Sequence, residues 1–509
     1  MFFISADSAS ECRAHVIVAI CALAGGALLF FSTSHGVGLS PDSAVYVGAA
    51  RSLLQGHGYS MPTDTGTFAP VAHFPPLYSI SLSLLSWLGS DPFTAARWLN
   101  IVLLTASAFL AGLIAFLATG SWVLSGSAAA LIITSYPVIL VHSMAWSEPL
   151  FIFFQLAGIF FLVRFFQQAE QSNLIVAAMA TGLSILSRYA GFASVVAGLA
   201  AILWLHEKPL GRKFHACAIF LAVSLTPISF WLVRNRWTTG SGTNRRLTFH
   251  LLGSDHLNGA VEAVASWFSA FWEAPAEAQI VAATLGLFGV FVGCRMGRDR
   301  APVRASELYR RSRHVVCLSG LTVVTYLCLL CVSISFVDYY TPLDSRILAP
   351  AYAMAVLMGI SLALSFRQER QELLATFAGI AIFVVALQVP RTWIWLDFVR
   401  REGVGYNARV WAQSALLNRL REIDPAVKIF SNAPDLIYTR LGRSSGTIPS
   451  KFHPDTRAPN PEFYVQLMEM QKTLRGPTYH FRQSQLALVF ADGKRTRIDN
   501  PIDRHCADQ

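Results

Sequence analysis

Long apolar runs separated by short polar segments fill the first three-quarters of the 509-residue chain. Most of these runs have the length and composition of membrane-spanning helices. The pattern predicts eleven spans, at residues 14–34, 98–118, 122–141, 149–166, 174–188, 190–205, 214–233, 279–294, 315–337, 347–366 and 373–389. We therefore expect an all-α polytopic transmembrane domain over residues 1–390, followed by a polar extramembrane domain over 391–509.

One further apolar run, Leu77–Leu88, is too short to be a span. Twelve helical residues rise about 18 Å, whereas the hydrocarbon core is about 30 Å thick. Pro75–Pro76 and Gly89 bound the run on its two sides. We expect this segment to form a helix that lies at the membrane interface.

The distribution of basic residues tests this count of eleven. With a cytoplasmic N-terminus, the loops 206–213, 295–313 and 367–372 fall on the cytoplasmic side, as the positive-inside rule requires. The second of these loops contains seven arginines, and counting Leu77–Leu88 as a span would move it outside. We expect a multi-pass protein of the plasma (inner) membrane, with the C-terminal domain on the periplasmic or extracellular face.

Composition agrees with a membrane protein. Hydrophobic residues make up 54% of the chain, mean hydropathy is +0.47, and charged residues are 14%, against about 25% in soluble domains. The net charge of +10 is concentrated in a few segments, which favours cytoplasmic loops and an anionic substrate over nucleic acid. Nearly all of the eight cysteines lie in or beside apolar runs, so no disulfide framework is expected.

Two acids stand at predicted helix starts on the outer side. Asp42 precedes an amphipathic helix at about 43–55, and Glu148 begins the span in HSMAWSEPLF. An acid at either position stabilises its helix through the helix dipole. It can also serve as a base or hold a partner at the membrane surface. These structural and functional interpretations are compatible.

Several arginines lie on the same side, where the positive-inside rule disfavours them. They are Arg188, Arg234, Arg236 and Arg346. Snorkelling and pairing with nearby acids such as Asp344 are the structural alternatives. Arginines that meet acids at one face also form a site for phosphate, because each gains about 4 kcal/mol from a phosphate charge at about 4 Å and an effective dielectric near 20.

Other chemistry is not indicated. The sequence has no Walker A loop, no G-x-S-x-G elbow and no H-E-x-x-H motif. The pair Cys328 and Cys331 lies inside a predicted span without a second ligand pair, so no metal site is predicted there.

An ordered set of motifs resembles the GT-C superfamily of membrane glycosyltransferases. The resemblance is to the bacterial branch that includes protein O-mannosyltransferases, lipid A aminoarabinose transferases and lipopolysaccharide galacturonosyltransferases. The motifs are PDSAVYVGAARSLL, PPLYSISLSLLSWLG, SEPLF, SRYAG, RNRWTTGS, DSRILAP and SNAPDLIYTRLGR. The resemblance implies a polyprenyl-phosphate sugar donor, an envelope glycan, lipid or protein acceptor, and an active site on the outer side.

The resemblance also implies roles for single residues. Asp42 matches the first-loop acid that deprotonates or orients the acceptor, and Glu148 matches the second acidic position. Some relatives have a lysine before the proline of the second motif, where this chain has His73–Phe74. The outer-face arginines are then expected to bind the donor phosphate, and His73, Tyr78 and Tyr189 are expected to contact the substrate. A structural role alone is favoured for His73 and Tyr78.

No cofactor is predicted with certainty. Relatives differ in their use of a divalent metal, and the sequence shows no convincing ligand set. Transfer by attack from the face opposite the leaving group would invert the anomeric carbon.

The C-terminal region predicts a small α/β domain. Asn407–Arg421 has the pattern of an amphipathic helix, VKIFSNAPDLIYTRLGRSSGTIP predicts strand, loop, helix and strand, and LALVF predicts another strand. Positioning the acceptor and capping the membrane domain are both open as roles for it.

Two other functional hypotheses remain at this stage. A transporter or flippase for an anionic glycolipid explains the spans and the basic character equally well. Transporters tend to have charged sites near the midplane in repeated halves, whereas the charges here lie at outer helix ends. A non-catalytic scaffold for envelope polysaccharide assembly is the third hypothesis.

Overall fold

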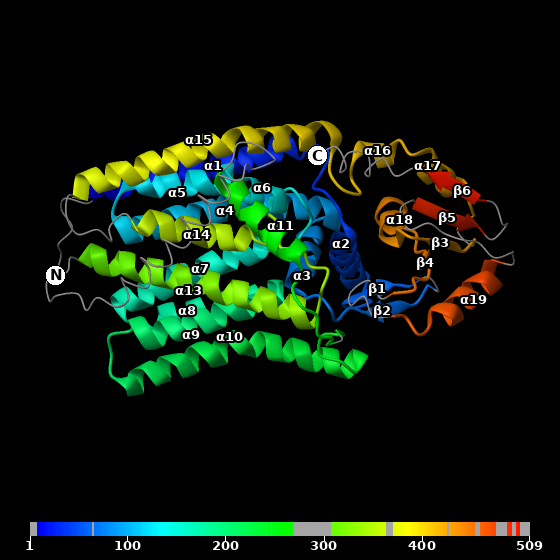
Figure 1. Ribbon diagram of the computed structural model, residues 1–509, viewed down its shortest axis with the longest axis horizontal. Helices are drawn as coiled ribbons and strands as arrows, with labels where there is room; N and C mark the ends of the chain where they lie inside the picture. Colours follow the sequence, from blue (N-terminus) through cyan, green and yellow to red (C-terminus); the bar gives the residue numbers. More distant parts are fainter. Residues whose placement is uncertain are drawn as a thin grey trace.

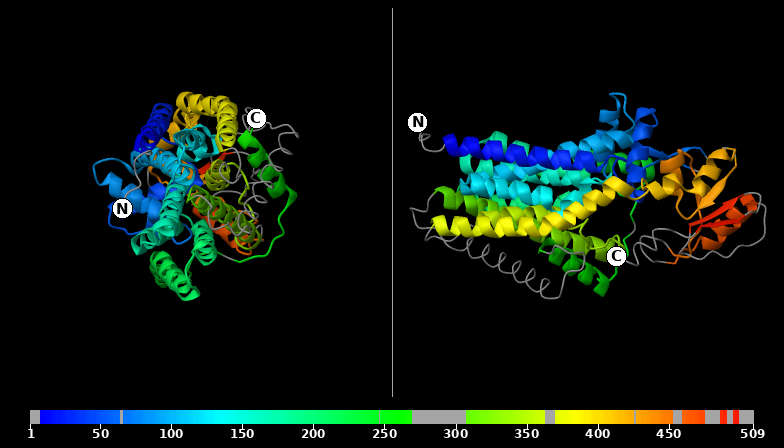
Figure 2. Two further views of the ribbon diagram at one scale, coloured as in Figure 1. Left: turned by 90° about the vertical axis from the view of Figure 1, so that its left-hand side faces the viewer. Right: turned by 90° about the horizontal axis from the view of Figure 1, so that it is seen from above.

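The computed structural model describes residues 8–63, 66–245, 247–268, 307–362, 370–424, 427–452, 459–474, 486–490 and 495–498. Long helices run side by side along one axis and form a bundle, with a smaller domain beyond one end of it (Figures 1 and 2). The bundle comprises α1 (Ser8–Ser32), α4 (Pro92–Thr119), α5 (Trp122–Thr134), α6 (Tyr136–His142), α7 (Glu148–Gln168), α8 (Gln171–Ser187), α9 (Phe192–Leu205), α10 (Leu210–Thr239), α13 (Glu307–Phe336), α14 (Ala349–Leu362) and α15 (Arg370–Glu402).

Within the described residues, six helices are long and apolar enough to cross a membrane, and a seventh span results if α5 and α6, which meet at 57°, are counted as one. Ten of the eleven predicted spans coincide with helices of the bundle. Three of these, α8, α9 and α14, have only 17, 14 and 14 residues. The predicted span 279–294 lies outside the described residues. The protein is an all-α, multi-pass membrane protein over this region.

Small residues let the helices of the bundle approach one another closely. A Cβ on Gly182 of α8 would lie 2.8 Å from the carbonyl oxygen of Ser224 on α10. Likewise, a Cβ on Gly112 of α4 would lie 2.6 Å from Val18 of α1. Such contacts are typical of membrane helices, whose association depends on packing because lipid offers no hydrophobic driving force.

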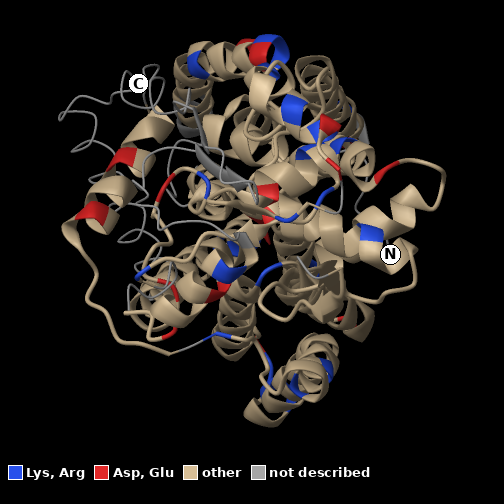
Figure 3. Ribbon diagram, turned by 90° about the vertical axis from the view of Figure 1, so that its right-hand side faces the viewer, with Lys and Arg blue, Asp and Glu red and all other residues tan. Residues whose placement is uncertain are grey.

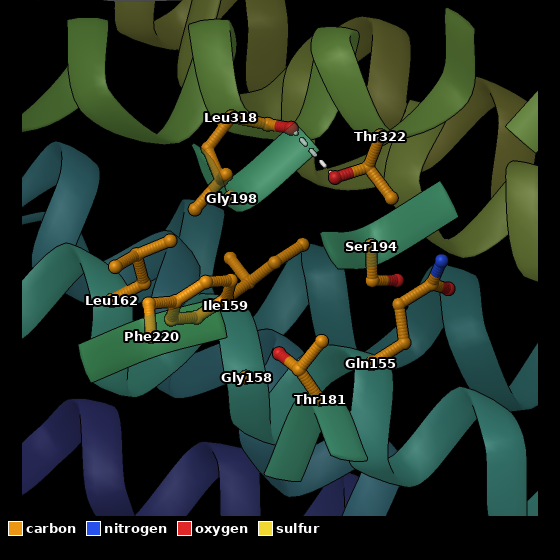
Figure 4. A pocket seen from close by; sticks show the side chains of 10 residues that line it. All are labelled: Gln155, Gly158, Ile159, Leu162, Thr181, Ser194, Gly198, Phe220, Leu318 and Thr322. Carbon is orange, nitrogen blue, oxygen red and sulfur yellow. Dashed lines mark hydrogen bonds between the residues drawn. The ribbon is translucent and has the colours of Figure 1, made fainter. Parts of the chain in front are cut away.

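Polar side chains are also present inside the bundle. Figure 4 shows a small cavity whose lining includes Gln155 of α7, Thr181 of α8, Ser194 of α9 and Thr322 of α13. Thr322 donates to the carbonyl oxygen of Leu318 at 2.8 Å. The amide of Gln155 has no hydrogen-bond partner among the described residues. These polar groups of the cavity are neutral, unlike the charged side chains at the end of the bundle beside the smaller domain.

The end of the bundle beside the smaller domain carries short elements. They are α2 (Pro41–Leu54), the antiparallel hairpin of β1 (Ser60–Pro62) and β2 (Phe68–Pro70), α3 (Leu77–Ser86), η1 (Tyr189–Gly191), α11 (Ser254–Ala265) and η2 (Ser266–Phe268). The predicted helix at 43–55 is confirmed as α2. The run Leu77–Leu88 is confirmed as a helix too short to span, since α3 has 10 residues.

The C-terminal region is a small α/β domain, as predicted. Its four-stranded sheet has the order β4-β3-β5-β6, with β3 and β4 parallel and the other pairs antiparallel. The elements are α16 (Arg409–Ala412), α17 (Ala415–Glu422), β3 (Ile429–Ser431), α18 (Pro434–Leu441), β4 (Gly446–Thr447), α19 (Phe463–Leu474), β5 (Leu486–Phe490) and β6 (Arg495–Ile498).

Two features of this region concern where its helices begin and end. The single helix predicted at Asn407–Arg421 is wrong: the structure has α16 and α17, because the hydroxyl of Ser414 caps a new helix by accepting from the Leu417 amide. Helix α15 also continues past residue 390 to Glu402, so it leads directly from the membrane domain towards the C-terminal domain.

Candidate active site

Asp42 lies in the first turn of α2. Ser40 is the N-cap, its hydroxyl accepting from the Ser43 amide at 3.4 Å, and Pro41 is the first helical residue. Serine followed by proline is a strong helix start, because the hydroxyl satisfies a free amide and proline needs none. The cap thus fixes Asp42 at the start of α2, with its side chain 31% exposed.

Glu148 lies in the first turn of α7 and is almost fully buried, with 1% of its side chain exposed. Its Oε1 atom receives two charged donors, Nη1 of Arg188 at 2.6 Å and Nε of Arg346 at 2.6 Å. Its Oε2 atom is buried without a hydrogen-bond partner in the described part of the chain. One carboxylate therefore holds two arginines that come from distant segments of the sequence.

Arg346 joins the two acids. Its Nη2 atom lies 2.5 Å from Oδ2 of Asp42 while its Nε atom binds Glu148. Its guanidinium stacks on the Trp146 ring, 3.9 Å from the centroid, and the Trp146 indole donates to the Ser40 hydroxyl at 2.7 Å. The ring thus ties the arginine to the cap of α2, and cation–π stacking adds to the ionic contacts.

The loop before α14 fixes the position of Arg346. Oδ1 of Asp344 accepts from the Ile347 amide at 2.9 Å and so closes a turn around Arg346. Burial raises the pKa of Asp344, although its backbone hydrogen bonds and the Arg346 charge oppose this. For Arg346, burial lowers the pKa, but the charges of Glu148 and Asp42 outweigh burial and raise it above its ordinary value.

We call Asp42, Glu148, Arg188 and Arg346 the ionic cluster. Its formal charge is balanced, with two acids and two arginines. Removing one partner from such a buried set leaves an uncompensated charge, which costs about 3–5 kcal/mol. The cluster lies at the end of the bundle that faces the C-terminal domain. Figure 3, a view from the side of the C-terminal domain, shows basic and acidic positions interspersed on this side of the molecule.

A layer of polar and aromatic side chains supports the cluster. The Tyr46 hydroxyl lies 3.0 Å from the Ser147 hydroxyl, which also accepts from Nη1 of Arg188 at 3.4 Å. Burial, together with the charges of Asp42 and Glu148, raises the pKa of Tyr46 far above its ordinary value. Tyr46 is therefore a neutral hydroxyl that helps to hold Ser147 against Arg188.

Tyr78 is fully buried and lies outside the ionic cluster. It packs edge-on against Tyr46, with ring centroids 5.2 Å apart, and its hydroxyl donates to Asn100 at 3.4 Å. Asn100 in turn donates to the carbonyl oxygens of His142 and Met144. The position agrees with the structural interpretation favoured by the sequence, since Tyr78 supports Tyr46 and the segment before Glu148.

Arg234 and Arg236, expected at the donor phosphate, do not reach the acids. Arg234 donates to the carbonyl oxygens of Val71 at 2.8 Å and Tyr59 at 2.9 Å, and so holds the hairpin loop against α10. Arg236 is exposed and donates to the carbonyl oxygen of Gly240, where α10 ends. The structure therefore separates the four predicted arginines into two pairs with different partners.

The remaining predicted residues lie beside the hairpin loop. Tyr189 donates to the carbonyl oxygen of Ala72 at 3.2 Å and accepts from the Trp231 indole at 3.1 Å. The neighbouring His73 ring lies 4.4 Å from that of Phe74. Among the described residues, no group of three histidine, cysteine or acidic side chains is placed to hold a metal ion.

Sequence reasoning missed several residues of the site. Trp146 and Ser147 directly precede Glu148, and Tyr46 lies one turn after Asp42. Each of them lies within about one helical turn of one of the two acids in the sequence, and this proximity could have indicated that they belong to the site. Nothing local to the sequence indicated that the Trp146 ring would support an arginine 200 residues further along the chain.

Part of the chain matches a known protein family. Residues 58–238 match the family model described as dolichyl-phosphate-mannose-protein mannosyltransferase. Glu148 and Arg188 fall within the matched segment, whereas Asp42 and Arg346 fall outside it. No curated protein matches the sequence.

The solved structures that share a distant likeness with this chain include two of ArnT and one of AglB. ArnT from Cupriavidus metallidurans bound to undecaprenyl phosphate is 12% identical, with 93% of this chain and 97% of that chain covered and a TM-score of 0.49. Its apo form is 13% identical, with 87% of each chain covered and a TM-score of 0.47. The oligosaccharyltransferase AglB from Archaeoglobus fulgidus, in complex with an inhibitory peptide and a dolichol-phosphate, is 13% identical, with 81% and 58% covered and a TM-score of 0.46.

The family match covers the segment that contributes Glu148 and Arg188. It confirms the resemblance of this chain to the GT-C membrane glycosyltransferases and supports a membrane glycosyltransferase as its general class.

Proposed function

We propose that the protein transfers a sugar from a polyprenyl-phosphate donor to an envelope glycolipid, polysaccharide or protein on the outer side of the membrane, with inversion at the anomeric carbon. The observation that carries the proposal is the ionic cluster, in which Arg346 contacts both Asp42 and Glu148. The family match over residues 58–238 supports the same reaction class.

Asp42 is the proposed general base. It is the more exposed acid of the cluster, so an acceptor can reach it, whereas Glu148 is buried. The acceptor oxygen or nitrogen forms a bond to the anomeric carbon while its proton passes to the Asp42 carboxylate. The bond between that carbon and the phosphate oxygen breaks, and its electron pair leaves with the lipid phosphate.

Arg346 and Arg188 are the proposed partners of the leaving phosphate. Both are held in place by Glu148, so their charges are preorganised before the donor binds. Fixed cations of this kind stabilise charge that develops on a leaving group. Arg346 also contacts Asp42, so a phosphate that draws this arginine away would free the base for the acceptor.

The orientation is part of the proposal. The cluster lies at the helix ends that the positive-inside rule places outside. In the proposed orientation the N-terminus lies in the cytoplasm and the C-terminal domain lies in the periplasm or outside the cell. The lipid tail of the donor would lie between spans, with its phosphate at the outer interface.

The test uses purified protein in nanodiscs, a panel of radiolabelled polyprenyl-phosphate sugars and an envelope extract as acceptor. Wild type is compared with Asp42→Asn and with Asp91→Asn. Asp91 is an exposed acid that pairs with Arg51 and caps α4, a function asparagine can also perform. We expect transfer by wild type and Asp91→Asn, and a loss of at least about a hundredfold in Asp42→Asn.

Full turnover in Asp42→Asn would refute the assignment of the base. If no donor is transferred or bound by well-folded wild type, the proposed reaction is wrong. Movement of a labelled lipid between leaflets without transfer would instead support the transporter hypothesis.

A further inference from the structure

The strand that leads into Asp42 is paired with the bundle along one edge. Gly38 and Met144 form a parallel β-bridge. The Gly38 amide donates to the Ser143 carbonyl oxygen at 2.8 Å, and the Ala145 amide donates to the Gly38 carbonyl oxygen at 2.8 Å. The segments that lead into the two acids of the ionic cluster therefore lie side by side before α2 and α7 begin.

The other edge of the same strand is paired with residues 405–407, which lie between α15 and α16. Leu39 and Gly405 form a parallel β-bridge, and the Tyr406 amide donates to the Leu39 carbonyl oxygen at 2.7 Å. Gly405 has a φ of +59°, and a Cβ at this position would overlap the Leu39 carbonyl oxygen. Both the left-handed backbone and the close approach require glycine here, so this contact leaves no room for a side chain.

Side chains of the same segment add to this contact. The Asn407 side chain donates to the carbonyl oxygens of His35 and Val37. The Tyr406 side chain packs against two hydrophobic clusters, one beside α2 that includes Val37 and one in the C-terminal domain that includes Trp411. This short segment thus joins the strand before α2 to the core of the C-terminal domain.

The two acids differ in how the segments before them are anchored. Before Glu148, the buried Asn100 of α4 donates to two carbonyl oxygens of the segment, at 2.9 Å and 2.6 Å. This anchor belongs to the bundle. Before Asp42, the second edge of the strand is held by residues 405–407. A disturbance of these residues should therefore act on Asp42 more than on Glu148.

We infer that residues 405–407 are a clamp that positions Asp42 for the transfer reaction, so that the C-terminal domain is part of the catalytic unit and not only a cap over it. Gly405 and Asn407 are positioning residues, because they act through the strand and not on the reacting atoms. The catalytic part of the inference rests on the proposed function. The clamp itself is a property of the protein without substrate.

The clamp acts over a short distance along the chain. Leu39 lies three residues before Asp42, and the residues between them are the cap and the first residue of α2. A shift of the strand is therefore passed to the first turn of α2, where Oδ2 of Asp42 lies 2.5 Å from Nη2 of Arg346. A displacement of about 1 Å at a reacting group can cost about a hundredfold in rate.

The first arm of the test measures the clamp without substrate. Hydrogen–deuterium exchange of full-length protein in nanodiscs is compared for wild type, Gly405→Ala and Gly442→Ala. Gly442 also has a positive φ, of +66°, but a Cβ there meets no atom within 4 Å, so this control has the backbone strain without the overlap. We expect the amides of residues 36–47 to exchange at least about fivefold faster in Gly405→Ala and at the wild-type rate in Gly442→Ala. Wild-type exchange in Gly405→Ala would overturn the clamp.

The second arm separates donor binding from transfer. In Gly405→Ala the rate of transfer at saturating donor should fall at least about tenfold, while donor affinity stays within about twofold of wild type, because Glu148 still holds both arginines. Asn407→Ala keeps the glycine and removes two side-chain hydrogen bonds, so we expect the same split with a loss of rate of about threefold. Gly442→Ala should equal wild type in both measurements. If Gly405→Ala does not fold, Asn407→Ala decides the question in both arms.

The outcomes separate a failure of the clamp from a failure of the proposed function. If donor affinity and transfer rate fall in equal proportion in Gly405→Ala and Asn407→Ala, the contact only maintains the fold and the positioning role is wrong. Wild-type rates of transfer in both variants would overturn it as well. If wild type transfers no sugar at all, the proposed function fails, and the exchange measurement alone decides whether residues 405–407 hold the strand.

Discussion

Two pairs of arginines at the same end of the molecule have different partners. Arg188 and Arg346 bind buried or half-buried carboxylates at 2.5–2.6 Å. Arg234 and Arg236 donate to backbone carbonyl oxygens, one holding the hairpin loop and the other at the end of α10. In the sequence all four have the same context, a predicted outer helix end beside polar residues.

The different partners distinguish two roles. The charges of Arg188 and Arg346 are available to a substrate, whereas those of Arg234 and Arg236 maintain the fold. A carboxylate can exchange its arginine for a phosphate, because both partners of the arginine are anions with similar geometry. A backbone carbonyl that loses its arginine gains nothing in return and is left unsatisfied. We therefore assign the donor phosphate to Arg188 and Arg346, and three substitutions test this division.

The largest effect is expected for Glu148→Gln. The change removes the charge that holds both arginines, so the free energy of unfolding should fall by about 3–5 kcal/mol and transfer should be lost. Thermal unfolding in nanodiscs and the transfer assay measure both. A melting temperature within about 2 °C of wild type would show that Glu148 does not hold the cluster together.

An intermediate effect is expected for Arg234→Lys. A lysine cannot reproduce the forked contacts with Tyr59 and Val71, so stability should fall by about 1–3 kcal/mol. Because the ionic cluster is intact, the folded fraction should transfer sugar within a few-fold of the wild-type rate. If donor binding falls by more than the amount of folded protein does, Arg234 contacts the phosphate. The distinction between the two pairs of arginines would then be wrong.

The smallest effect is expected for Arg236→Lys. The side chain is exposed and its contact lies at a helix end, so stability should change by no more than about 0.5 kcal/mol. Donor affinity and transfer should equal those of wild type. A weaker affinity for the donor in this variant would show that the side chain reorients towards the phosphate when substrate binds.

Most of the fold could be predicted from the sequence, because a long apolar run in a membrane protein directly indicates a helix. Ten predicted spans coincide with helices, and the short run at Leu77–Leu88 is a short helix. The break at Gln413–Ser414 was missed, because the amphipathic pattern continues across it and only the Ser414 cap separates α16 from α17. Local patterns report poorly on such boundaries.

The candidate site could be predicted in part. Asp42, Glu148, Arg188 and Arg346 can be identified from their place at predicted outer helix ends, and the structure brings these four together. The contacts of Arg234 with Tyr59 and Val71, by contrast, join segments far apart in the chain. Neither hydrophobic periodicity nor a motif specifies such contacts.

The most direct test of the central claim compares Arg346→Lys with Arg236→Lys in nanodiscs, measuring the affinity for a polyprenyl-phosphate sugar and the rate of its transfer. Lysine keeps the charge at either position but lacks the forked guanidinium through which Nη2 and Nε of Arg346 bind Asp42 and Glu148 separately. We predict that Arg346→Lys loses donor affinity and at least about a hundredfold of the transfer rate, whereas Arg236→Lys loses neither. Equal affinities and rates in the two variants would contradict the assignment of the ionic cluster as the site of transfer.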